Sequence, residues 1–385
     1  MTMRTALRLS PLEVAAGFPI GSEEVAAATE RPTLAPIAAL EQAIIPALER
    51  DPCVVSFSGG RDSSAVLALA TRLARREGLP APIPITLRFP GSPAADESHW
   101  QECVVRHLGL DDWQCEEITD ELDLVGPVAT GVLQRHGLLW PPNTHFHQPI
   151  LDRARAGAAL TGIDGDGVFS SWRWARPARI LRGRLRPRPR DAGRIVLALA
   201  PVPLRRAIEV RRPGVRMPWL RPQAVAALHE ARSGEAASEP ARWDRWIAWY
   251  ARRRAMRMVI EGFQLLAADA DVMAVHPFAD PAFLAALASD RRWAGIGDRT
   301  AAMKILCGDL LPTAVLHRPS KAVLDAPFWN TYSRDFASSW DGMGALNRLV
   351  DGDALRHEWL SRAPHACAST LLQAAWLRRN GSASC

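Results

Sequence analysis

A short run of small, hydroxyl-bearing and acidic residues follows an apolar stretch early in the chain. The stretch begins at Cys53 and reaches Phe57, and it predicts a buried strand. The run itself is Ser58, Gly59, Gly60, Arg61, Asp62, Ser63 and Ser64. Adjacent glycines let backbone N–H groups approach a ligand closely because no Cβ is in the way. The hydroxyls and the N-terminus of the helix expected next add donors and positive dipole, so the turn is predicted to bind phosphate.

The carboxylate inside this turn needs its own explanation, because alone it would repel phosphate. Asp62 is explained if it holds a Mg²⁺ ion that bridges to phosphate oxygens. The pattern is not the Walker P-loop, G-x-x-x-x-G-K-[ST], since no lysine follows the glycines. The alternative is that this segment is an ordinary strand, turn and helix without a ligand. Many positions match the motif directly behind an apolar strand, and this favours the phosphate site.

Four segments in order carry a family resemblance. S-G-G-x-D-S behind a strand resembles the PP-loop of the ATP pyrophosphatases, which cleave ATP between the α and β phosphates. The other segments are LTGIDGDGVFSSW (160–172), VHPFADPAFLAALAS (275–289) and MKILCGDLLPTAVLHRPSKAVLDAPF (303–328). Together they resemble the synthetase domain of the asparagine synthetase family, which also contains β-lactam synthetases and the macrolactam-forming cyclases of lasso peptides. The resemblance runs from about residue 34 to about residue 328.

The resemblance implies roles for residues of the matched segments. Pyrophosphate and Mg²⁺ would be bound by Ser58, Gly59, Gly60, Asp62, Ser63 and Ser64. Asp62 and Asp166 would hold the metal, and Arg318 and Lys321 would form a catalytic basic pair. In the family the lysine stabilises charge on the acyl-adenylate and the tetrahedral intermediate, as a preorganised ammonium can do in a dry site. Of the 47 basic residues only Lys304 and Lys321 are lysines. Arginine is a poor substitute where a site needs a compact ammonium, which favours a functional role for Lys321. The alternative is that these two lysines remain by chance in an arginine-rich chain.

Several positions depart from the family pattern. Gly167 stands where the family has a glutamate, Trp172 where it has a tyrosine, and residues 273–275 where it has Glu-x-Arg. Met1 is followed by Thr2 and only about fifty residues precede the turn, so we expect no glutamine-hydrolysing domain of the family type. Asp164 is a candidate replacement for a missing carboxylate. Three candidate bases for an attacking amine remain open, namely Glu261, His276 and His317.

The elements expected around these motifs alternate between strands and helices. Strands are predicted at 53–57, 82–89, 113–118 and 157–162, and helices at 34–50, 96–108 and 145–156. This order predicts an α/β fold with a parallel sheet and helices on both faces. The family resemblance implies that this fold is similar to that of the PP-loop adenine nucleotide alpha hydrolases. Residues 1–35 are unassigned, and the synthetase domain is expected over 36–385. It would comprise an α/β part to about 172, an Arg-rich segment at about 173–194 and a mainly helical remainder.

The Arg-rich segment interrupts this alternation. It holds nine arginines interleaved with prolines, and the one acidic residue within it is Asp191. We expect it to be exposed and partly mobile, either as a solvated loop or as a clamp for an acidic partner, a peptide or a nucleic acid. Further on, residues 242–266 carry tryptophans and other apolar residues at helical spacing, which favours a buried core over a platform for stacking nucleobases.

Composition narrows the functional classes. The 385-residue chain has no apolar run long enough to cross a membrane and no C-x-x-C pair among its six cysteines, so a cytoplasmic protein is expected. Its net charge of +6 permits nucleic-acid binding, but nucleic acid is not the expected partner. We expect an ATP- and Mg²⁺-dependent, AMP-forming amide-bond synthetase that acts on a small-molecule or peptide carboxylate and an amine, in natural-product or macrolactam biosynthesis. A tRNA-modifying PP-loop adenylase and a non-catalytic partner protein on the same fold are the alternatives.

Overall fold

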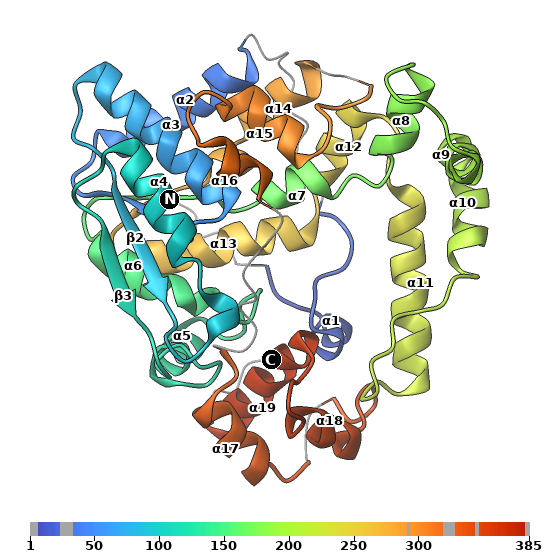
Figure 1. Cartoon of the computed structure of the whole chain (residues 1–385). Helices are drawn as coiled ribbons and strands as arrows, with labels where there is room; N and C mark the ends of the chain where they lie inside the picture. The colour runs from blue at the N-terminus through green and yellow to red at the C-terminus, as the bar shows by residue number, and fades with distance from the viewer. Residues whose placement is uncertain (1–6, 24–33, 291–292, 319–327, 343–345, 382–385) are drawn as a thin grey trace.

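The centre of the protein is a sheet of five parallel strands in the order β3-β2-β1-β4-β5 (Figure 1). The computed structural model describes residues 7–23, 34–290, 293–318, 328–342 and 346–381. The strands are β1 (Cys53–Ser56), β2 (Ile83–Arg88), β3 (Gln114–Glu117), β4 (Ala158–Thr161) and β5 (Met273–Val275). The predicted α/β class, the parallel sheet and the mainly helical remainder are therefore confirmed, and within that remainder the structure adds a short fifth strand that the sequence analysis did not predict.

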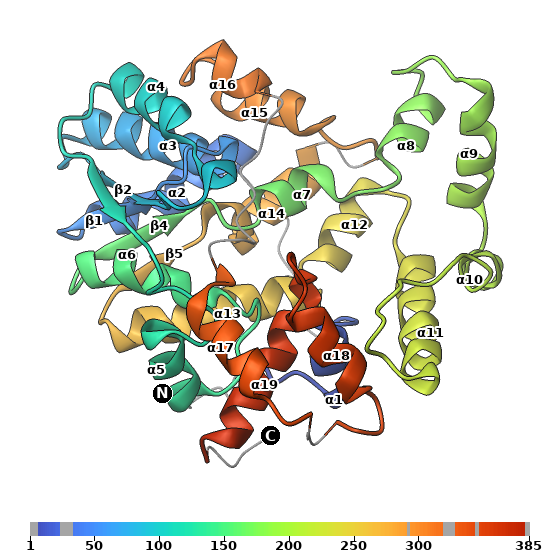
Figure 2. The same cartoon turned by 60° about the horizontal axis from the view of Figure 1, so that its bottom comes forward.

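Helices cover both faces of the sheet, and the central strands are apolar on both faces for that reason. Val55 and Leu160 belong to the core formed with α2 (Pro36–Leu48), α3 (Arg61–Glu77) and α14 (Pro281–Asp290). Val54 and Ala159, which point the other way, pack with α6 (Gln148–Arg153) and α13 (Arg254–Asp269). Figures 1 and 2 show these two helical layers on opposite sides of the strands.

The remaining elements enclose this centre. The other helices are α1 (Pro11–Ala16), α4 (Ser98–Leu108), α5 (Pro127–His136), α7 (Gly165–Ser170), α8 (Ala175–Leu181), α9 (Ala192–Leu199), α10 (Val202–Glu209), α11 (Pro222–Ser238), α12 (Trp243–Tyr250), α15 (Arg299–Cys307), α16 (Thr313–His317), α17 (Thr331–Ser339), α18 (Gly352–Trp359) and α19 (Ser369–Arg379). Short 3₁₀ helices are η1 (Pro93–Ala95), η2 (Thr144–His147), η3 (Pro189–Asp191), η4 (Pro277–Ala279) and η6 (Ala366–Ala368). Among the described residues, every helix is too short or too polar to cross a bilayer.

A second core joins the N-terminal helix to the end of the chain. It packs α1, α11, α17, α18 and α19 around Trp219, Trp340 and Trp359. Helix α1 lies in the region that the sequence analysis left unassigned. It begins with a capping box, in which Ser10 accepts from the Glu13 N–H and Glu13 accepts from the Ser10 N–H. This S-x-x-E signature is legible in the sequence.

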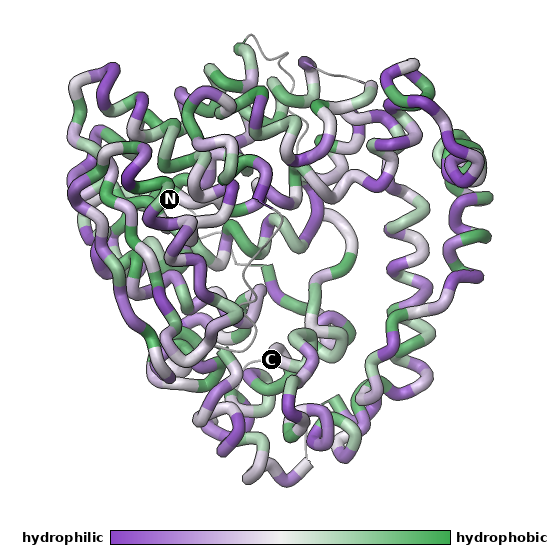
Figure 3. The backbone as a smooth tube through the Cα atoms, in the orientation of Figure 1, coloured by the Kyte–Doolittle hydropathy of each residue, from purple (hydrophilic) through white to green (hydrophobic). Residues whose placement is uncertain are grey.

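The Arg-rich segment is more ordered than the expected loop. It contains α8 and η3 and runs into α9, although Figure 3 shows the connection from α8 to α9 as mainly hydrophilic. Nε and Nη2 of the Arg176 guanidinium donate to the two oxygens of the Asp191 carboxylate, at 2.7 and 2.6 Å. This ion pair links α8 to η3, the two ends of that connection. Trp243 and Trp246 of α12 are buried, as predicted, and stack at 5.1 Å between ring centroids, whereas Trp249 is half-buried.

Candidate active site

The Ser/Gly turn lies at the carboxyl end of the central strand and leads into α3. Gly59 has φ +79°, and a Cβ there would lie 2.8 Å from Cγ of Gln101. Both features require glycine. Ser63 Oγ donates to the Gly60 carbonyl at 3.1 Å and lies 3.1 Å from Ser58 Oγ. The turn is thereby fastened to the first turn of α3, whose leading N–H groups have no partner within the helix.

A second loop, after β4, packs directly against the start of α3. Strands β1 and β4 are neighbours in register, with Ser56 opposite Thr161, so their loops emerge side by side. A Cβ on Gly162 would lie 2.6 Å from the Ser63 nitrogen, and one on Gly165 would lie 2.7 Å from Asp62 Oδ1. The two glycines therefore permit the contact between the loops, and the structure brings the predicted Asp62 and Asp164–Asp166 regions together.

Three carboxylates meet where these loops touch. Burial raises the pKa of Asp164, the negative charges of Asp166 and Asp62 add to this increase, and a hydrogen bond from Tyr250 opposes it, so that the pKa is about 6. That bond runs from Tyr250 Oη to Asp164 Oδ1 over 2.5 Å. The other oxygen of Asp164 is buried and has no hydrogen-bond partner among the described residues.

The three carboxylates offer oxygen ligands of the kind that a divalent cation binds. Within the described part of the chain, no three His, Cys, Asp or Glu side chains form a complete metal site. Mg²⁺ does not need one, because it keeps several waters and uses one or two carboxylates together with substrate phosphates. Asp62 and Asp166, whose charges both act on Asp164, fit that kind of site together with the buried Asp164 oxygen that has no partner among the described residues. Their role as metal ligands stays a prediction.

Positive charge also gathers at the turn. Asp62 accepts from Arg299 Nε at 3.2 Å and makes an ion pair with the same guanidinium. Arg61 donates to Thr300 Oγ1 at 3.1 Å. The pKa of Arg61 is lowered by burial and by the nearby charges of Arg299 and Arg318, against the attraction of Asp62. Three guanidinium groups therefore surround the predicted phosphate site.

Arg318 holds the turn from behind. Its side chain is 2% exposed and donates to the Gly59 carbonyl at 2.7 Å and to Glu97 Oε1 at 2.5 Å. Its guanidinium carbon lies 5.0 Å from the centre of the Trp100 ring. These contacts make Arg318 a positioning residue for the turn. Lys321, its predicted catalytic partner, lies outside the described residues.

The remaining candidates lie in three different settings. Lys304 is exposed on α15, and His317 is exposed at the end of α16. Glu261 accepts from the Leu7 N–H at 3.1 Å and pairs with Arg257. His276 is buried with its Nδ1 2.7 Å from Thr161 Oγ1, and burial lowers the pKa of its ring to about 4.

The sequence analysis missed three residues that contact the predicted site. Arg299 is one of 45 arginines and carries no signal that separates it from the others. Glu97 stands in an acidic stretch at the start of α4 and gives no local clue to its partner. Tyr250 did carry a signal, because the chain has only two tyrosines, and the rarity argument applied to lysine applies equally to it.

The chain matches a known protein family. A family model described as asparagine synthase matches residues 38–376 of the chain. The match includes the sheet, both loops of the candidate site and most of the helical remainder. No curated protein sequence matched the chain.

Proposed function

Because the chain belongs to the asparagine synthase family, whose members are ATP-dependent, AMP-forming ligases, we propose that it forms an amide bond by adenylating a carboxylate. The observation that carries this proposal is the meeting of two loops. One supplies the Ser/Gly turn and Asp62, and the other supplies Asp166. This combination suits the polyphosphate of ATP.

We assign the binding of ATP to groups at the turn. The leading N–H groups of α3 and the hydroxyls of Ser58, Ser63 and Ser64 would donate to phosphate oxygens. Asp62 and Asp166 would hold Mg²⁺, which supplies charge neutralisation for the pyrophosphate. Arg299 neutralises Asp62 in this structure, so we expect its guanidinium to turn toward the phosphates when the metal binds.

The first chemical step is then an in-line displacement. A carboxylate oxygen of the substrate bonds to the α-phosphorus of ATP, while the bond from that phosphorus to the oxygen bridging to the β-phosphorus breaks. Pyrophosphate leaves with the electron pair, and negative charge grows on its oxygens. Fixed donors at the start of α3 and the surrounding guanidinium groups would stabilise that charge more in the transition state than before it.

The second step transfers the acyl group to an amine. The amine nitrogen bonds to the carboxyl carbon, the amine gives up a proton, and AMP leaves with the electrons of the C–O bond. Lys321 would stabilise the tetrahedral intermediate, as its match to the family implies. Tyr250 fills the space beside Gly167, where the family has a glutamate. This difference supports an acceptor other than that of asparagine synthesis, such as the amine of a peptide or of an amino-acid-derived acid, with an amide or macrolactam as product.

Pyrophosphate exchange tests the proposal. The protein is incubated with ATP, Mg²⁺, labelled pyrophosphate and pools of amino acids or short peptides, and label in ATP is measured. We expect exchange with one pool, loss of exchange in Asp62→Asn and retention in Asp111→Asn, an exposed aspartate between α4 and β3. Equal exchange in both variants would refute the role of Asp62. Failure of the wild-type protein to bind ATP with Mg²⁺ would refute the enzyme itself.

A further inference from the structure

The positive charge of this protein is concentrated in one part of the chain. Residues 173–216, here called the arm, contain α8, η3, α9, α10 and the loop that follows. They hold 14 of the 47 basic residues and 2 of the 41 acidic residues, a net charge of +12. The rest of the chain has 33 basic and 39 acidic residues, so its net charge is −6. Both Figure 1 and Figure 2 show α9 and α10 at the edge of the molecule.

The arm is also the most exposed apolar part of the structure. Seven of the twelve large hydrophobic side chains that are exposed among the described residues belong to it. They are Leu181, Val196, Leu199, Val202, Leu204, Val210 and Val215. Val196 and Leu199, at 67% and 66% exposure, are three positions apart on α9 and share one face of that helix. Apolar patches of this kind mark interaction sites on proteins in water.

Cationic side chains also line a pocket on the arm. It has a volume of about 420 Å³ and is lined by Arg176, Asp191 and three further arginines, Arg188, Arg190 and Arg194. The Asp191 carboxylate is already bound by both nitrogens of the Arg176 fork. The other three guanidinium groups therefore give the pocket a net positive charge, and they suit the carboxylates of a partner.

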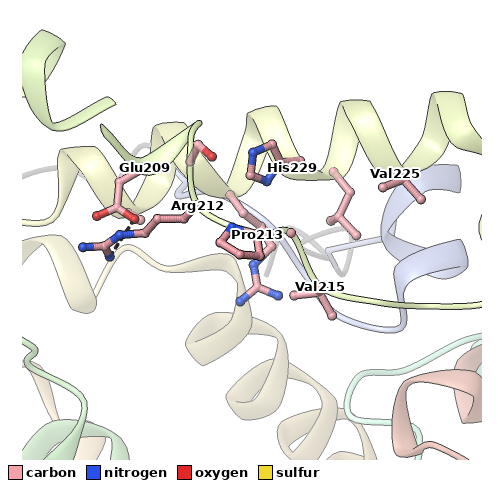
Figure 4. Close-up of a pocket in the computed structure, with 11 residues that line it drawn as sticks. Glu209, Arg212, Pro213, Val215, Val225 and His229 are labelled. Atoms are coloured by element: carbon pink, nitrogen blue, oxygen red, sulfur yellow. Dashed lines mark hydrogen bonds and ion pairs between the residues drawn. The ribbon is translucent and has the colours of Figure 1, made fainter. Parts of the chain in front are cut away.

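A second pocket lies between the end of the arm and α11. Its volume is about 190 Å³, which is below the usual range for small-molecule sites and suits a single side chain. In Figure 4, Val215 and Val225 lie at one end and Arg212, paired with Glu209 at 3.0 Å, lies at the other. An apolar side chain of a partner would meet matching groups at the end that Val215 and Val225 line.

We propose that the arm binds an acidic, amphipathic polypeptide segment. Its apolar side chains would cover Val196 and Leu199, and its carboxylates would meet Arg188, Arg190 and Arg194. The opposite net charges of the arm and of the partner would also accelerate their encounter. The proposal concerns binding alone and does not depend on the reaction proposed above.

Two other occupants fit the arm less well. A nucleic acid would use the arginines, but its phosphate backbone would leave the exposed valines and leucines of the arm in contact with water. A second copy of the chain in a symmetric contact would place one arm against another. Each arm carries a charge of +12, so that contact would be repulsive.

The test uses the full chain and a fluorescent synthetic peptide of about 20 residues with Glu and Leu at amphipathic helical spacing. A scrambled peptide of the same composition and a duplex DNA of similar charge serve as comparison ligands. The test variant combines Val196→Ser with Leu199→Ser, which leaves the charge unchanged. Leu360→Ser is the matched control, because Leu360 is 46% exposed and lies outside the arm.

We expect fluorescence anisotropy to show the amphipathic peptide binding about tenfold more tightly than the scrambled one. The double variant should weaken that binding about tenfold, with no effect on DNA binding and no effect in Leu360→Ser. Equal affinity for the two peptides, or an unchanged double variant, would overturn the proposal. So would tighter binding of the duplex, or self-association of the protein that the double variant abolishes.

Discussion

Replacing Arg318 with methionine tests whether this residue holds the Ser/Gly turn in place. The side chains of Arg318 and Glu97 are 2% and 9% exposed and form an ion pair. The same guanidinium donates to the Gly59 carbonyl at 2.7 Å. Methionine keeps much of the side-chain volume but leaves a buried carboxylate without its cation and a carbonyl without its donor.

The expected cost follows from the burial of the pair. Removing one partner of a buried ion pair costs about 3–5 kcal/mol, because the remaining charge has lost the solvent that would stabilise it. Replacing both partners by apolar residues is often close to neutral. We therefore expect Arg318→Met to lower the free energy of unfolding by about 4 kcal/mol, and Arg318→Met combined with Glu97→Leu to recover most of that loss.

Urea unfolding of the wild type, both single variants and the double variant gives the coupling energy. We expect at least about 3 kcal/mol of coupling, the part of the loss that the double variant recovers, against less than about 1 kcal/mol for the exposed pair of Arg206 and Glu230, which serves as control. ATP binding should weaken in Arg318→Met at temperatures where the protein is folded. A coupling energy at Arg318 as small as that of the control would refute the view that a dry ion pair positions the turn.

Three further results are expected. Gly167→Ala should lower stability by about 1–3 kcal/mol in thermal unfolding, because the new Cβ would lie 1.8 Å from the Tyr250 hydroxyl, whereas Gly131→Ala, in open space on α5, should be neutral or stabilising. Gly162→Ala should weaken ATP binding in calorimetry, since its Cβ would meet the backbone of α3 at 2.6 Å; unchanged affinity would contradict the close packing of the two loops. Burial raises the pKa of Glu239 to about 7, so its protonated form is favoured on folding, and the stability that this gives is lost as pH rises from about 4.5 to 7. The free energy of unfolding from urea titrations should therefore fall more between pH 5 and pH 8 for the wild type than for Glu239→Gln, by about 1–3 kcal/mol.

The sheet could be predicted where its strands carry strong local signals. β1 and β4 are short apolar runs followed by glycine-containing loops, and that pattern is local. β5 has only three residues, Met273–Val275, and these are half-buried. A segment that short has no periodicity to read, and it becomes a strand because β4 offers it an edge.

The arrangement of the arm could not be predicted from its composition. Proline and arginine favour an irregular, solvated segment when only near neighbours are considered. Carboxylates that order it lie far along the chain, inside and outside the arm, as when Arg173 binds Glu209 at 3.0 Å and Glu239 at 3.1 Å. Glu239 is 66 residues away in the sequence, and such pairings are not visible before the fold is known.

The candidate site also has one part that general rules predict from the sequence and another that depends on contacts between distant residues. The meeting of Asp62 with the loop that holds Asp166 followed from a general rule, since the loops of neighbouring parallel strands emerge at one edge of a sheet. Arg299 reaches Asp62 from 237 positions away, and Arg318 reaches Gly59 from 259 positions away. No spacing rule connects residues that are so far apart, and both are arginines in a chain that has 45 of them.

Gly167 and Tyr250 are best understood as one feature of the site. In the sequence, Gly167 stands where the family has a glutamate, which indicates only that a carboxylate is missing. In the structure the Tyr250 hydroxyl occupies the place of its Cβ and donates to Asp164. A carboxylate is thus still present in this part of the site, but it belongs to Asp164 and is reached from α12. Restoring glutamate at position 167 alone would therefore produce a clash, because the space that it needs is already filled by the tyrosine.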